Sequence, residues 1–391
     1  MVGVSNHEPL TRLGHNLSGF VRRLPVWVTA FAAHELLMLC AYFVPYPKFP
    51  GVQHRAFAGL GHFWFQWDAL WYISIGQHGY QHLPGVPALA GTAFFPWLPL
   101  MIRMVGVYPS FGLTQLAFAT ALWLLVRLCK NLGLSTRQIA AASFLLALNP
   151  AAIYFSTLYA EPWTVFFTLS SIDFGRRQRW GYASIFGLLA ATTQATGVLV
   201  GIFPLTEFLW SLLRRRWQRA RGPFVWGVGP FLGIASFAAY LGWRFHKPLL
   251  FASIQSTPYW SASWRWPWLQ WYAGLRLALT HKPMDVLLLG LWVVVSLFLV
   301  SILFLFRSVQ FSLDPLRLGL LVYGLVGIIL SLSFYHAHSP LYSTVRIVSI
   351  YFPLYIGISR GPRWFGTTSF ILFTSLAFYG ALLFTHQWWY Q

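Results

Sequence analysis

Long apolar runs separated by short arginine clusters constrain the fold of this chain more than any other feature. Hydrophobic residues make up 57% of its 391 residues, and charged residues only 9%. Because each charge buried in hydrocarbon is costly, a chain with so few charges presents most of its surface to lipid. The sequence therefore predicts an all-α polytopic membrane protein, with one integral membrane domain over residues 1–391.

The basic residues explain the net charge of +19. Short clusters between apolar runs hold 18 of the 27 lysines and arginines, for example at 176–179 and 214–221. The positive-inside rule assigns such clusters to the cytoplasm. The charge therefore determines topology, and we expect no nucleic-acid partner.

A helix needs about 20 apolar residues to cross a bilayer, and fewer where it is broken inside a bundle. This predicts about 11 spans (10–13), near 25–45, 111–129, 138–157, 162–175, 181–195, 197–213, 225–243, 284–306, 316–334, 342–359 and 366–385. For each of two segments the sequence leaves two alternative structures. Residues 94–107 form either a full span or a re-entrant half-helix, and residues 181–213 form either two short spans or one bent helix.

With these crossings the N-terminus lies inside, and two long segments, 46–93 and 244–283, lie outside. Both are rich in Trp, Tyr and Pro. Interfacial aromatic residues anchor a segment at the level of the lipid headgroups. We therefore expect short amphipathic helices that lie on the membrane lipids, with the first external loop at 46–93 and the second at 244–283.

Two acidic residues lie where an external segment meets a span, Asp68 in "QWDALWY" and Glu161 in "LYAEPW". Aromatic walls around Asp68 desolvate its carboxylate, which suits a general base. Asp68 is equally placed to be the N-cap of a helix over 69–77. Physical chemistry alone leaves both interpretations open.

The stretch "FYHAHSPLYSTVRIVSIYFP" carries His336, His338 and, inside an apolar run, Arg346. A His-x-His pair can bind a metal, but no third ligand is in register, so we expect no metal. Arginine within a span neutralises an anionic group, such as a lipid phosphate or a carboxylate.

Five stretches in order then resemble one family: "WDALWYISIGQHGY", "AFFPWLPLMIR", "NPAAIYFSTLYAEP", "KPLLFASIQSTPYW" and "STVRIVSIYFPLY". Their order from about 60 to 360 is similar to the motif series of the GPI mannosyltransferase II (PIG-V) family and its shorter prokaryotic relatives. The resemblance implies a GT-C-like bundle. It also implies an inverting transfer of mannose from a polyprenyl-phosphate donor to a hydroxyl of a lipid or glycan acceptor on the extracytoplasmic side.

The resemblance makes Asp68 the expected catalytic base. It places in the donor or acceptor pocket Trp67, Tyr72, Phe94, Phe95, Pro96, Tyr159, Glu161, Gln194, Gln255 and Trp260. Gln194 departs from the family, which often has an arginine there. The chain is shorter than eukaryotic members, which favours a prokaryotic plasma membrane protein and an acceptor other than a GPI anchor.

The leaving lipid phosphate needs cationic partners, and the candidates are Arg346, His336, His338, Lys247 and Arg265. Since these groups can stabilise the phosphate, we expect no cofactor. The sequence leaves both alternatives for a small membrane partner subunit, present or absent. A transporter or flippase is the main alternative, but such proteins often contain inverted repeats, and we find none. A non-catalytic scaffold is the third hypothesis, which Gln194 keeps open.

Overall fold

The computed structural model describes residues 24–44, 61, 64–80, 87, 89–280, 285–311, 314–336, 341 and 343–385. Within these ranges the chain is almost wholly helical, which confirms an all-α polytopic membrane protein. Seven helical stretches among the described residues are long and apolar enough to cross a bilayer. They are α2 (Val26–Phe43), α6 (Val107–Asn131), Ala195–Leu213, α11 (Trp217–Phe245), α14 (Val286–Phe311), α15 (Pro315–Ser333) and α18 (Arg363–Thr385).

Of these stretches, Ala195–Leu213 contains α10 (Ile202–Leu213). The other helices of the bundle are shorter: α7 (Thr136–Ala147), α8 (Glu161–Arg176), α9 (Trp180–Thr193), α16 (Thr344–Val348) and α17 (Pro353–Arg360). The spans expected near 138–157 and 342–359 are not continuous helices, since α7 ends at Ala147 and the later segment divides into α16 and α17. After α7, the Asn149 side chain accepts a hydrogen bond from the Ala151 N–H at 2.7 Å and donates to the Leu146 carbonyl at 2.8 Å. Such a local turn ends a helix. The total of about 11 crossings stays a prediction.

The two open segments have definite structures. In 94–107 the helix is α5 (Trp97–Val105), whose nine residues extend about 14 Å, half of the hydrocarbon core. In 181–213 the chain breaks at Gln194, between α9 and the 3₁₀ helix η3 (Ala195–Gly201). Gly197 there packs so tightly that a Cβ would lie 1.9 Å from the Ala190 carbonyl oxygen. Two helical segments form, not one continuous helix.

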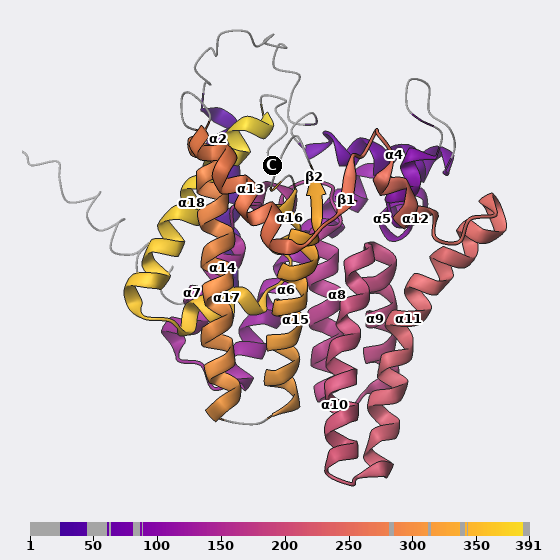
Figure 1. Cartoon of the computed structure of the whole chain (residues 1–391), viewed down its shortest axis with the longest axis vertical. Helices are drawn as coiled ribbons and strands as arrows, with labels where there is room; N and C mark the ends of the chain where they lie inside the picture. The colour runs from indigo at the N-terminus through magenta and orange to yellow at the C-terminus, as the bar shows by residue number, and fades with distance from the viewer. Residues whose placement is uncertain are drawn as a thin grey trace, which may run out of the picture.

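Short elements gather at one end of the long helices, at the top of Figure 1. They are α4 (Asp68–His78), η1 (Ala90–Ala93), α5, α12 (Leu250–Ser253), η4 (Ile254–Ser256), β1 (Ala262–Trp264), α13 (Pro267–Thr280), β2 (Phe334–His336) and α16. The strands pair antiparallel, with Ala262 opposite His336. Segments far apart in the sequence, including the expected first and second external loops, thus meet at this end.

Candidate active site

The backbone before α4 is strained and held by one tyrosine. Trp67 has φ 54° and ψ −116°, a combination that a residue with a side chain rarely adopts. The Tyr159 hydroxyl donates to the Gln66 carbonyl at 3.2 Å and accepts from the Asp68 N–H at 3.1 Å. These bonds flank Trp67 on both sides. Strain of this kind costs about 1–3 kcal/mol and persists where the surroundings fix the backbone, as Tyr159 does here.

Asp68 is the first residue of α4, and Trp67 takes the N-cap position without a side-chain capping bond. The N-cap interpretation of Asp68 is therefore wrong. Its carboxylate instead meets Arg346, with Oδ2 2.6 Å from Nη1. The contact joins residues 278 positions apart.

Arg346 also binds Glu161, with Nε 2.5 Å from Oε1. The Tyr154 and Tyr159 rings each lie 4.8 Å from the guanidinium carbon, a cation–π distance. Only 12% of the Arg346 side chain is exposed, against 16% for Asp68 and 3% for Glu161. A desolvated arginine between two carboxylates makes charge-assisted hydrogen bonds, which are stronger than neutral ones.

Both acids lie at the start of a helix, Asp68 in α4 and Glu161 in α8. Pro162 follows Glu161 in the first turn, where proline is tolerated because its missing N–H has no helical partner. A carboxylate at a helix N-terminus is stabilised by the helix dipole. With both acids ionised, the cluster of Asp68, Glu161 and Arg346 carries one net negative charge.

Aromatic side chains build the wall beside this cluster. Tyr72 is buried on α4, and burial raises its pKa well above the usual value. The carboxylates of Glu161 and Asp68 raise it further, while Arg346 opposes them. Tyr72 is therefore a neutral phenol near pH 7. The ring of Phe94 lies 5.1 Å from Tyr72, 5.5 Å from Trp71 and 5.7 Å from Trp260.

The structure brings six of the expected site residues together: Asp68, Glu161, Arg346, Tyr159, Tyr72 and Phe94. Trp67 precedes Asp68 and is 37% exposed, and Trp260 joins through the aromatic wall. Phe95 packs instead on Phe237 and Phe251, in a separate apolar cluster. Pro96 is the N-cap residue of α5.

The remaining expected residues lie in other elements. Lys247 and Arg265 are exposed, Gln255 belongs to η4, and Gln194 ends α9. His336 is the last residue of β2, and His338 lies outside the described residues. Among the described residues no group of three metal-binding side chains occurs.

Sequence analysis missed Tyr154, and it counted Trp71 only among the aromatic residues around Asp68. Tyr154 lies in the same "YFSTLYAEP" stretch as Tyr159 and Glu161, and its ring covers Arg346. Trp71 follows Asp68 by three residues, so the two lie on one face of α4. The second tyrosine in this stretch pointed to Tyr154, and the spacing of three residues from Asp68 pointed to Trp71.

One family model matches the chain: mannosyltransferase (PIG-V), over residues 48–201. The matched segment contains Asp68, Tyr154, Tyr159 and Glu161, whereas Arg346 lies beyond it. A comparison with curated proteins gives no significant match. Together, the match and the apolar helices support a membrane mannosyltransferase.

Proposed function

We propose that this membrane glycosyltransferase, a PIG-V family mannosyltransferase by its match over 48–201, uses Asp68 as its catalytic base. It transfers mannose from a polyprenyl-phosphate donor to a hydroxyl of a lipid or glycan acceptor. The observation that carries the proposal is the placement of Asp68. This carboxylate starts a helix, is bound by Arg346 and is fixed through its backbone by Tyr159.

The reaction is an inverting displacement at the anomeric carbon. The acceptor oxygen forms a bond to that carbon while its proton passes to the Asp68 carboxylate. The bond from the anomeric carbon to the phosphate oxygen breaks, and the lipid phosphate leaves with the electron pair. The transition state resembles an oxocarbenium ion, as in other glycosyl transfers.

Arg346 serves this chemistry in two ways. It orients the Asp68 carboxylate through Nη1, and in this proposal its positive charge stabilises the negative charge that develops on the leaving phosphate. Glu161 holds the other edge of the guanidinium through Nε and keeps Arg346 in place when Asp68 has accepted the proton. The exposed Lys247 and Arg265, with His336 and His338, are further candidates for the phosphate.

The active site faces the extracytoplasmic side in this proposal. In Figure 1 the connection from α10 to α11 lies at the end opposite α4. This connection carries Arg214, Arg215 and Arg216, all exposed. By the positive-inside rule the arginine-rich end is cytoplasmic, which supports an external position for Asp68.

The direct test is Asp68→Asn in purified enzyme with a polyprenyl-phosphate mannose donor. Removal of a positioned base reduces turnover by about 100- to 10,000-fold. Asp173→Asn is the matched control, because Asp173 also pairs with arginines, Arg127 at 3.1 Å and Arg177 at 2.7 Å, at the far end of α8. Near wild-type turnover of Asp68→Asn would remove Asp68 as the base.

A further inference from the structure

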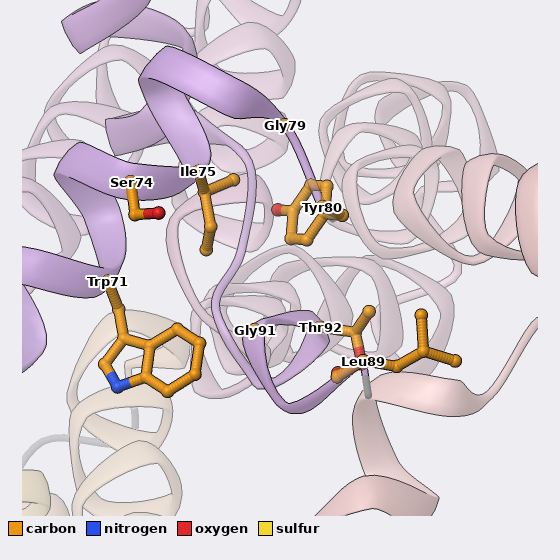
Figure 2. A pocket seen from close by; sticks show the side chains of 8 residues that line it. All are labelled: Trp71, Ser74, Ile75, Gly79, Tyr80, Leu89, Gly91 and Thr92. Atoms are coloured by element: carbon orange, nitrogen blue, oxygen red, sulfur yellow. The ribbon is translucent and has the colours of Figure 1, made fainter. Parts of the chain in front are cut away.

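The cavity between α4 and η1 (Figure 2) is too small for a substrate. Its volume is about 10 Å³, enough for about one water molecule. Trp71 and Ile75 of α4 pack closely on Gly91, where an added Cβ would lie 3.4 Å from Trp71 Cζ3 and 3.6 Å from Ile75 Cδ1. Further residues that serve the site are instead found among the buried polar side chains, and His34 of α2 is one of them.

His34 is an ionisable side chain near the middle of the apolar helix α2. It is fully buried and lies on the same face of the helix as Ala30 and Met38. Transfer of an imidazole from water into an apolar interior is unfavourable unless its nitrogens find hydrogen-bond partners. An ionisable residue inside a spanning helix is therefore retained for the bonds that it makes.

Both ring nitrogens of His34 bind residues far away in the sequence. Nδ1 lies 2.6 Å from the Ala147 carbonyl oxygen, and because a carbonyl only accepts, Nδ1 donates. In a neutral imidazole Nε2 is then the acceptor, so the Ser156 hydroxyl donates to it at 2.7 Å. A carboxylate oxygen of Glu35 lies 3.7 Å from Nε2, which is beyond hydrogen-bond distance. The ring thus joins Ala147 to Ser156.

These two partners belong to the break between α7 and α8. Ala147 is the last residue of α7, in the turn whose carbonyls lack helical partners. Ser156 directly follows the 3₁₀ helix η2 (Ala152–Phe155). Residues 148–160, here called the connector, form no α-helix, yet each of them is buried. A buried segment of this kind needs partners for its polar groups, and His34 ties it to the end of α7.

The connector carries the tyrosines that cover Arg346. The Tyr154 ring, two residues before Ser156, lies 4.8 Å from the guanidinium carbon. The Tyr159 ring lies at the same distance from that carbon and 5.1 Å from the Tyr154 ring. The link from His34 to Arg346 is therefore short: one hydrogen bond, part of one 3₁₀ turn and a cation–π contact.

We propose that His34 is a positioning residue: through Ser156 it holds the connector, and with it the cation–π contact to Arg346, in place. The guanidinium in turn orients the Asp68 carboxylate, so an error in its position reaches the reacting atoms. As a fully buried group, His34 acts only through other residues. Its effect on turnover rests on the proposed function, whereas its link to Arg346 is a property of the fold.

Asparagine and glutamine separate the two bonds of His34. The asparagine amide branches from Cγ, as Nδ1 does, and keeps a donor for Ala147. The glutamine amide reaches the ε position, as Nε2 does, and keeps an acceptor for Ser156. In His34→Asn and in Ser156→Ala the bond to the connector is lost, so we expect kcat to fall by about 10- to 100-fold while the donor KM changes little. His34→Gln should keep most of the wild-type kcat.

Turnover is measured with polyprenyl-phosphate mannose as the donor and octyl α-mannoside as the acceptor probe. Ser171→Ala is the matched control, because the buried Ser171 also links helices: it accepts from Trp226 Nε1 at 2.7 Å and donates to the Ala183 carbonyl at 2.8 Å. Its loss should lower thermal stability and leave kcat unchanged. The positioning role is overturned if Ser156→Ala likewise lowers stability alone, or if His34→Gln loses as much kcat as His34→Asn.

A stability measurement separates this inference from the proposed function, because it needs no turnover. Ser156→Ala and Arg346→Lys are made singly and together, and thermal unfolding is followed in detergent. Lysine keeps the charge but lacks the planar guanidinium that stacks on the two tyrosines. If the bond to His34 holds this contact, the Tm of the double variant falls by less than the sum of the single losses, even where Asp68→Asn retains turnover. Additive losses, as expected for Ser171→Ala with Arg346→Lys, overturn the link.

Discussion

At the scale of single residues, Tyr159 is the side chain on which the position of Asp68 depends most. Its hydroxyl bonds the backbone on both sides of the strained Trp67. In Tyr159→Phe both bonds are lost and the strain is no longer restrained. We expect the free energy of unfolding to fall by about 1–3 kcal/mol and kcat to fall while the donor KM changes little. Thermal unfolding in detergent and steady-state kinetics measure the two effects.

The control for this prediction is Tyr355→Phe. The Tyr355 hydroxyl is also buried and donates to the Ser349 carbonyl at 2.9 Å, but it lies outside the Asp68 cluster. A comparable stability loss with unchanged kcat is expected there. If Tyr159→Phe also lost stability without a change in kcat, the hydrogen bonds of Tyr159 to the backbone around Asp68 would have no part in catalysis.

Arg346 is the second residue with a definite energetic role. Arg346→Ala leaves the buried Glu161 and the partly buried Asp68 carboxylates without their cation, and breaking a buried ion pair costs about 3–5 kcal/mol. The added change Glu161→Gln removes one of the unpaired charges and recovers part of that loss. Thermal unfolding of the two single variants and the double variant forms a double-mutant cycle. Additive losses would contradict the coupling seen in the structure.

At the scale of elements, the long helices follow from the sequence and the broken ones do not. The expected spans near 25–45 and 366–385 correspond to α2 and α18, because uninterrupted apolar runs specify such helices. The segment 342–359 is also apolar, but it splits into α16 and α17, and Pro353 begins the second. Arg346, which binds both Asp68 and Glu161, therefore lies on α16, a helix of only five residues.

The candidate site was predictable to a similar extent. Asp68, Glu161 and Arg346 were recognisable as charges in apolar surroundings, where each needs a partner. Their pairing was not, since it depends on contacts between α4, α8 and α16 across 278 positions.

Close packing of α9 against α11 gives a prediction about these elements. A Cβ on Gly229 would lie 1.9 Å from the Ser184 carbonyl oxygen, and one on Gly233 would lie 2.5 Å from that of Leu188. Small residues four apart let membrane helices approach in this way. Gly229→Val forces the helices apart, so we expect a marked drop in thermal stability and in folded yield. Gly181→Val, where no atom lies within 4 Å, should be tolerated far better.

At the scale of the whole molecule, the two ends of the bundle differ in charge and composition. One end carries α4 and the short elements around it, and the other carries the connection between α10 and α11 (Figure 1), where Arg214, Arg215 and Arg216 are exposed. The charge asymmetry fixes orientation during insertion, and the orientation decides on which side the acceptor is glycosylated. The direction in which the bundle lies in the membrane is thus part of the function.

Cysteine accessibility in intact cells tests this orientation. In a chain without Cys40 and Cys129, Ser256→Cys places a thiol on the exposed end of η4, near the site, and Gln218→Cys places one in the exposed arginine-rich segment. A membrane-impermeant maleimide should label Ser256→Cys in intact cells and Gln218→Cys only after permeabilisation. The reverse pattern would put the Asp68 cluster on the cytoplasmic side. The donor sugar would then be used on the cytoplasmic side, opposite the arginine-rich end, and the extracytoplasmic proposal would fail while the geometry of the site stayed as described.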